Sequence, residues 1–249
     1  MRRARCTASV LHELTPEIWP GQLLVGQFSS RFLDADEESE LAFWRDEIVP
    51  SLAPVEGQRA HRAIDFEKLL QLGLSGLRAQ IQHYRKPLDL ARPADMERDI
   101  FYQGCLICLH GLADLSQRYA AHAQQIAETC SDPACRDEYL KLARICRHVP
   151  QHPADTFWEA LQAVHLVTFA LCASQQMLLF QLGRPDRYLL PYYQRDLARG
   201  LMTPEQAQEL IDCLCLMLNT YMPKGLAVGF MVGGRDGSGR DVCNDLTRM

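Results

Sequence analysis

Apolar residues recur every three or four positions along most of the chain after residue 65, which is the pattern of helices that bury one face. The first of these stretches carries its apolar residues at Phe66, Leu69, Leu70, Leu74, Leu77 and Ile81. Gly73 and Gly76 lie inside it, and glycine in a helix interior permits a bend or close packing. A second helix is predicted over about residues 97–129. A third follows Asp132, which can cap a helix that ends near His148.

Two capping boxes mark the beginnings of two further helices. In each box a threonine hydroxyl can accept a hydrogen bond from the backbone three residues later, and the side chain at that later position reaches back. The boxes are Thr156-Phe157-Trp158-Glu159 and Thr203-Pro204-Glu205-Gln206. Two apolar runs, residues 176–182 and 227–232, are candidate buried strands. The glycine-rich stretch over residues 233–239 is predicted to turn rather than to hold a phosphate.

The first 60 residues show no clear periodicity. Leu23-Leu24-Val25-Gly26 is a candidate short strand, residues 34–40 form an acidic run expected to face solvent, and prolines interrupt the segment that follows. The pattern therefore predicts two parts. An irregular N-terminal segment covers residues 1–60, and a predominantly α-helical domain with two or three late strands covers residues 61–249.

Composition narrows the class of protein. The 249 residues are 47% hydrophobic and 23% charged, which is typical of a soluble globular protein. A net charge of -5 offers no basic surface for nucleic acid or for an anionic membrane. The basic N-terminus is followed by no apolar region, so a secretory signal is not predicted. Ten scattered cysteines, several inside apolar helical stretches, fit buried thiols in a reducing cytoplasm better than a disulfide framework.

One segment is long enough to cross a membrane. Residues 160–183 contain no Asp, Glu, Lys or Arg. Polar residues nevertheless interrupt it at Gln162, His165, Thr168, Ser174, Gln175, Gln176 and Gln181. We therefore expect a buried core helix that continues into a strand, and no membrane contact.

A zinc site is the other chemistry that residue types suggest. The residues concerned are Cys130, Cys135, Cys146, His148 and His152. Their spacing is not that of a standard zinc site, and the intervening sequence is helical, so core and surface thiols are the favoured interpretation and no metal is predicted.

Four motifs follow one another in a fixed order. They are His61-Arg62-Ala63-Ile64-Asp65-Phe66-Glu67-Lys68, then Pro153 to Gln162, then Gly183-Arg184-Pro185-Asp186 continuing to Ala207, and then Val232-Gly233-Gly234 continuing to Thr247. Together they resemble the signatures of the glycyl radical enzymes, the pyruvate formate-lyase-like proteins that include glycerol dehydratase and choline trimethylamine-lyase. The resemblance covers roughly residues 60–249.

Three departures from the family pattern stand out. Ala60 occupies a position where the family often has glycine, and Arg187 replaces the usual glutamine after Asp186. The interval between Gly26 and His61 is also shorter than is usual in the family, which suggests an internal deletion.

The resemblance implies a fold and a chemistry. The family fold is an α/β barrel of ten strands wrapped in helices, of which this chain would supply a few strands of an incomplete barrel. An activating enzyme that cleaves S-adenosylmethionine installs a radical on a glycine, and the radical passes to a cysteine that abstracts hydrogen from the substrate. Both residues lie downstream of the Gly183 signature in the family, and this sequence ends at Met249. We therefore expect no catalytic residue and no bound cofactor here.

The expected function is that of a truncated or split part of a glycyl radical lyase or dehydratase, inactive by itself. Its partners would be a complementary C-terminal half or a second copy of the chain, and the activating enzyme for the full-length relative. The alternative is a non-catalytic helical module or a gene relic. His61 is the one candidate substrate-binding residue, because the histidine of this motif in dehydratase-like relatives resembles one that bonds a substrate hydroxyl. The run Met177-Leu178-Leu179-Phe180 is expected to be barrel core rather than a substrate contact.

Overall fold

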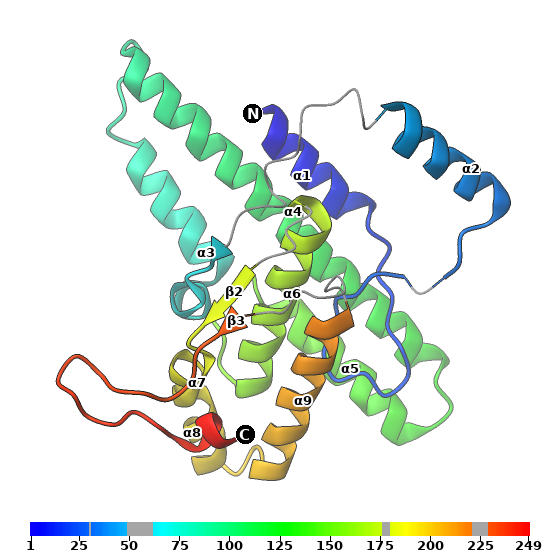
Figure 1. Ribbon diagram of the computed structural model, residues 1–249, viewed down its shortest axis with the longest axis vertical. Coiled ribbons are helices and arrows are strands. Elements are labelled where there is room, and N and C mark those ends of the chain that lie inside the picture. Colours follow the sequence, from blue (N-terminus) through cyan, green and yellow to red (C-terminus); the bar gives the residue numbers. More distant parts are fainter. Residues whose placement is uncertain (30, 49–61, 176–179, 221–228) are drawn as a thin grey trace.

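The computed structural model describes residues 1–29, 31–48, 62–175, 180–220 and 229–249 of the chain. Within them, a small three-stranded sheet lies beside the helices, with α3 above and α7 below it in Figure 1. The helices are α1 (Arg2–Glu13), α2 (Ala35–Phe43), α3 (Phe66–Arg85), α4 (Pro93–Thr129), α5 (Pro133–His148), α6 (Phe157–Gln175), α7 (Pro185–Tyr188), α8 (Leu190–Ala198), α9 (Pro204–Thr220) and α10 (Asp245–Arg248). A π-helical turn, η1 (Trp44–Ile48), continues α2.

The sheet is short and entirely parallel. Its strands are β1 (Arg62–Ala63), β2 (Phe180–Gly183) and β3 (Gly229–Phe230), with β2 in the centre. Ala63 pairs with Gln181, and Gln181 pairs in turn with Gly229. Apolar side chains from the end of β3 onward are exposed: Phe230 by 49%, Met231 by 61% and Val232 by 44%. Parallel sheets are usually covered on both faces, so this exposure leaves an apolar surface without cover among the described residues.

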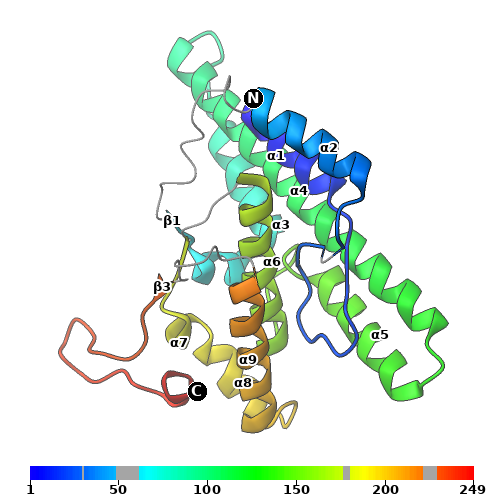
Figure 2. The same cartoon turned by 45° about the vertical axis from the view of Figure 1, so that its right-hand side comes forward.

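Helix α4 is the long helix against which several other helices pack. Its 37 residues extend about 55 Å, and α1, α3 and α5 pack along it (Figures 1 and 2). Arg118 of α4 fixes the end of α1, because its guanidinium donates to the backbone carbonyls of Leu11 and Leu14 and to the Asp114 carboxylate at 3.0 Å. These carbonyls would otherwise lack partners at the helix C-terminus.

Helix α6 runs through the centre of the molecule and is buried along nearly its whole length. Its N-terminus is held by Asp196 of α8, whose Oδ2 accepts from the Phe157 backbone N–H at 2.7 Å. The capping box predicted at Thr156 is present, with the Glu159 N–H donating to the threonine hydroxyl at 3.2 Å. Of the described residues, only the window Phe157–Ser174 is long and apolar enough to cross a membrane, and 72% of it is buried inside the protein, as expected of a core helix.

Side chains of α6 bind the backbone of residues 23–26. The Gln162 amide accepts from the Val25 N–H at 2.9 Å and donates to the Val25 carbonyl at 2.7 Å, as a neighbouring strand would. Trp158 donates to the Leu23 carbonyl at 2.8 Å, and His165 Nε2 donates to the Gly26 carbonyl at 2.7 Å. The predicted strand at Leu23-Leu24-Val25-Gly26 is therefore wrong: the segment is a buried loop whose backbone is paired by side chains.

The helix predictions from Asp65 onward are confirmed at their caps. Asp65 caps α3 through the Lys68 N–H at 3.0 Å, Asp132 caps α5, and Thr203 begins the capping box of α9. Two of the predicted strands exist at Phe180–Gly183 and Gly229–Phe230, although residues 176–179, 227 and 228 lie outside the described residues. The sequence pattern did not predict strand β1 or the helices α1, α7 and α8.

The described part of the N-terminal segment, residues 1–29 and 31–48, is more regular than predicted. Helix α1 is amphipathic and buries Thr7 and Leu11 against α4, and Asp34 begins α2 with a complete capping box. The prediction failed because α1 contains several arginines and small residues, so its apolar face is narrow. The boundary proposed between residues 60 and 61 stays a prediction.

Gly73 interrupts α3. Its φ of +60° is left-handed, and the next two backbone N–H groups leave the helix to bond the carbonyls of Pro150 and Gln151 at 2.9 and 3.0 Å. A Cβ atom at position 73 would lie 2.5 Å from the carbonyl carbon of His152. The bend anticipated from the glycine is therefore a site where two backbones touch.

We expect Gly73→Ala to lower the free energy of unfolding by more than the ~1–2 kcal/mol that a left-handed alanine costs, because the new methyl group also meets backbone. Gly200→Ala is the matched control, since Gly200 has a φ of +65° with open space around its Cβ position. Urea denaturation of both variants measures the difference. Equal losses would show that crowding at Gly73 contributes nothing.

A second expectation concerns pH. Burial lowers the pKa of His165 from 6.5 to about 4, so the folded protein holds this side chain neutral while the unfolded chain protonates it. The stability contributed by the neutral form is complete above pH 6.5 and is lost as the pH falls towards 4, at up to about 1.4 kcal/mol per pH unit.

His165→Gln, which can still donate to the Gly26 carbonyl, should therefore flatten the decline in unfolding free energy between pH 6.5 and pH 4.5. Urea denaturation of parent and variant across this range isolates the histidine, because all other groups titrate in both proteins. Parallel pH curves would contradict the assignment.

Candidate functional site at the carboxyl ends of the strands

The segments that follow the three strands meet at one edge of the sheet. Gly183 ends β2 with a φ of +71° and leads into Arg184, and Gly233 and Gly234 follow β3 with φ of +63° and +85°. Arg184 donates through Nη2 to the Gly233 carbonyl, and a Cβ on Gly234 would lie 3.4 Å from the same nitrogen. Ligands of open parallel sheets bind outside the carboxyl ends of the strands, so this edge is the candidate site.

Asp186 connects these turns by hydrogen bonds. Its buried Oδ2 accepts from the Gly233 N–H at 2.6 Å and from the Thr247 hydroxyl at 2.9 Å, and its backbone carbonyl accepts from the Asn244 amide at 2.9 Å. Two motifs some 50 residues apart in the sequence are thereby joined. These contacts give Arg184 and Asp186 a role in holding the fold, and Arg184 fills it by donating to a backbone carbonyl.

His61 lies outside the described residues, so its assignment as a substrate-binding residue stays a prediction. The same holds for Met177, Leu178 and Leu179. The residues after position 61 are described: Arg62 and Ala63 form β1, whose carboxyl end leads directly into the Asp65 cap of α3.

A cavity of about 630 Å³ opens beside this edge, between the beginning of α3 and helices α7 and α8. Ligand sites commonly have this size. Its charged lining consists of Arg184, Arg187, Arg195, Asp65 and Glu67. Its apolar wall includes Ile64, Phe66, Leu70 and Leu182, and the rings of Phe66 and Tyr188 lie 5.7 Å apart.

Several buried polar atoms around this cavity have no hydrogen-bond partner among the described residues. They are Arg184 Nε, Asp186 Oδ1, Arg187 Nε and Nη2, Tyr188 OH and Arg195 Nε. Burial and the nearby Asp186 charge raise the pKa of Tyr188, so its hydroxyl stays protonated. Unpaired buried polar groups are rare in folded proteins. Their concentration here indicates that the cavity binds a further molecule or segment, which would complete these hydrogen bonds.

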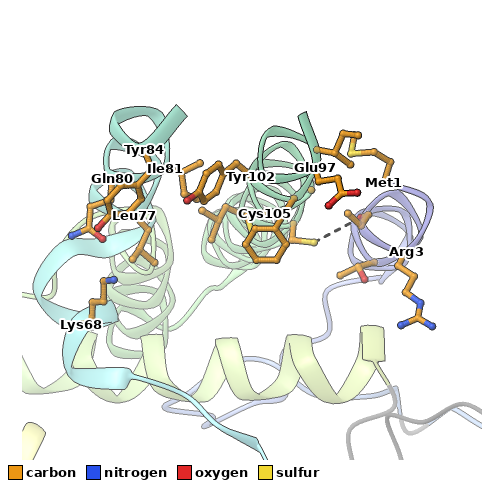
Figure 3. A pocket seen from close by; sticks show the side chains of 17 residues that line it. Met1, Arg3, Lys68, Leu77, Gln80, Ile81, Tyr84, Glu97, Tyr102 and Cys105 are labelled. Carbon is orange, nitrogen blue, oxygen red and sulfur yellow. Dashed lines mark hydrogen bonds between the residues drawn. The ribbon is translucent and has the colours of Figure 1, made fainter. Parts of the chain in front are cut away.

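A larger groove of about 860 Å³ lies between α1, α3 and α4 (Figure 3). Leu77, Ile81, Tyr84 and Tyr102 line it, together with Cys105 and Cys108 of α4. Burial raises the pKa of both thiols, which makes them poor nucleophiles. The groove is therefore an apolar surface whose two thiols are not activated as nucleophiles.

All ten cysteines are free thiols. Within the described ranges no group of three or more His, Cys, Asp or Glu side chains could hold a metal ion. The glycine-rich stretch after β3 turns back on itself, with Asp236 accepting from the Ser238 and Arg240 N–H groups at 2.8 and 3.1 Å, as the prediction of a turn requires.

Sequence reasoning missed the cluster of arginines around the cavity. Arg187 had a signal, because it replaces the glutamine of the family pattern, but one substitution does not reveal a cavity. Arg195 had none, because only the turn between α7 and α8 brings it to the same wall.

Comparison with known proteins agrees with the order of the motifs. Residues 5–249 match the family model described as pyruvate formate lyase-like. The chain is 28% identical over 200 residues to isethionate sulfite-lyase of Bilophila wadsworthia, covering 74% of this chain and 24% of that protein. It is 32% identical over 210 residues to the probable dehydratase YbiW of Escherichia coli, covering 84% of this chain and 25% of that protein.

Solved structures have the same fold. A structure described for 1,2-propanediol dehydration in Roseburia inulinivorans superposes with a TM-score of 0.87 at 25% identity, over 98% of this chain and 37% of that one. A glycyl radical enzyme from Archaeoglobus fulgidus superposes with a TM-score of 0.85 at 24% identity, over 99% of this chain and 40% of its own. The predicted fold class, part of a glycyl radical enzyme barrel, is thus confirmed.

The chain spans about a quarter of the length of the curated relatives that it matches. The family model, in contrast, matches almost the whole of this chain. The chain therefore belongs to the pyruvate formate lyase-like family.

Proposed function

We propose that this chain is the N-terminal part of a glycyl radical lyase or dehydratase, which cleaves a C–C, C–O or C–N bond of a small molecule by a radical route. The observation that carries the proposal is the junction of Arg184 and Asp186 with the Gly233 turn, because there two family motifs distant in sequence form one wall. Relatives named as a sulfite-lyase and as dehydratases support the reaction class.

The uncovered end of the sheet also supports a larger assembly. Phe230, Met231 and Val232 expose apolar side chains where a further layer or further strands would cover them. A complementary C-terminal segment is the partner that we propose, with a second copy of the chain as the other source of cover. A cytoplasmic location and a separate activating enzyme are part of the same proposal.

The residues present do not fit the radical group itself. Gly104-Cys105 is the one pair that resembles the family's catalytic glycine–cysteine, yet it precedes the Gly183 signature and lies within α4. No catalytic step can be assigned to it. In this proposal residues 1–249 contribute the substrate-side wall, and the radical glycine and its cysteine come from elsewhere.

An activation experiment tests whether the radical site lies outside residues 1–249. Residues 1–249 incubated anaerobically with an activating enzyme and S-adenosylmethionine should give no protein-centred EPR doublet. The same chain supplied with the segment encoded beyond codon 249 should give one, provided that segment carries the glycine–cysteine and radical-glycine motifs. A doublet from residues 1–249 alone would overturn the division of labour, and DNA without those motifs would favour a non-catalytic module.

His61→Ala tests the substrate contact. Losing one hydrogen bond to a neutral hydroxyl costs about 1–3 kcal/mol, so kcat/KM of the complemented enzyme should fall roughly ten- to a hundredfold. The radical yield should not change, because the histidine is not expected to take part in activation. His83→Ala, on the solvent side of α3, is the matched control. Unchanged kcat/KM for His61→Ala with every diol and amine tested would remove the residue from the site.

A further inference from the structure

We propose that the cavity beside α7 and α8 binds a small oxyanion group, a carboxylate, sulfonate or phosphate, through Arg187 with the support of Arg184 and Arg195. The cavity would serve this purpose whether or not the proposed radical chemistry holds. The three arginines come from three places, namely the turn after β2, helix α7 and helix α8, and all line the same 630 Å³ space.

Arg187 is a half-buried cation with no ion-pair partner among the described residues. Its Nε and Nη2 atoms are enclosed, have no hydrogen-bond partner among the described residues, and no ion pair within those residues includes it. Burying a charge without a partner is costly, so an anion that reaches this side chain gains more than it would at the surface. Nε and Nη2 form one edge of the guanidinium fork, the geometry that binds two oxygens of one group.

Contact with that edge requires the Arg187 side chain to turn towards the cavity. A change of rotamer on a flexible stem is a common part of ligand binding. The unpaired state favours such a movement, because no hydrogen bond of the guanidinium edge with the described residues has to break.

The other two arginines are fixed and supply positive charge. Arg184 is held by its bond to the Gly233 carbonyl. Arg195 lies 5.1 Å from the centre of the Tyr192 ring and is 3.5 Å from Asp155, a carboxylate that it shares with Arg199. One carboxylate therefore serves two guanidinium groups, which leaves positive charge at the cavity wall.

The two carboxylates that line the cavity do not cancel this charge by contact. Asp65 is committed to the Lys68 N–H at the beginning of α3, and Glu67 accepts from the Gln71 amide at 3.3 Å. Both belong to residues exposed to solvent, where screening weakens their field, whereas the Arg187 fork edge is enclosed. An apolar wall of Ile64, Phe66 and Leu182 strengthens the attraction between Arg187 and an anion.

The test is a titration of the purified chain with sodium phosphate, methanesulfonate or acetate. Sodium chloride keeps the ionic strength constant, so that screening does not change. Thermal unfolding and calorimetry are the readouts. At least one anion should raise the unfolding temperature saturably and bind with a measurable heat, and the anion that binds most tightly identifies the group that the site takes.

Arg187→Gln restores the residue of the family pattern and should weaken this binding roughly tenfold or more. Without added anion the variant should unfold at the same or a higher temperature than the parent, because it no longer encloses an unpaired guanidinium edge. A purely structural arginine would behave in the opposite way. Arg187→Lys keeps the charge, loses the fork and should bind with intermediate affinity. Arg98→Gln, on α4 and outside the cavity, should bind as the parent does.

Two results would overturn the proposal. One is a parent protein whose unfolding temperature and heats respond to no anion beyond the effect of chloride. The other is saturable binding that survives unchanged in both Arg187→Gln and Arg187→Lys, which would place the anion elsewhere. The parent titration decides the first point even if a variant does not fold.

Discussion

The structure depends on the burial of α6 with its polar side chains satisfied. Gln162 and His165 are fully buried, and each would cost several kcal/mol without a hydrogen-bond partner. The backbone of Val25 and Gly26 supplies these partners, so the N-terminal loop is held against the core by the groups that make α6 unusual for a core helix. The same pairing explains why an apolar helix of membrane-spanning length lies inside a protein core.

The core around α6 also holds the elements of the candidate site in place. Asp196 ties the beginning of α6 to α8, and α8 carries Arg195 to the cavity wall. On the opposite side, Asp186 ties α7 to the turn after β3. Helices α7 and α8, which line the cavity, are thus each fixed by a buried carboxylate, while the Arg187 fork edge has no bond to the described residues. Fixed walls with unpaired polar groups between them are typical of a binding site rather than of packing.

Local chemistry in the sequence predicted most of the helices, because a cap such as Asp65 or Thr156 acts within four residues. It failed for Leu23 to Gly26, where a short apolar run suggested a strand but the partner is a glutamine far along the chain. Strand β1 was invisible because two residues carry no periodicity. The motif around Gly183 is evident in the sequence, whereas the cavity beside it depends on how α3, α7 and α8 converge, which no local pattern records.

The bond between Val25 and Gln162 joins residues 137 positions apart. During synthesis the chain is made from the N-terminus, at about 5–20 residues per second, so the loop at Val25 leaves the ribosome many seconds before its partner exists. Until then its apolar residues, Leu24 and Val25 among them, have no interior to enter. The loop therefore stays exposed until α6 has been synthesised. Throughout that interval chaperones can bind it.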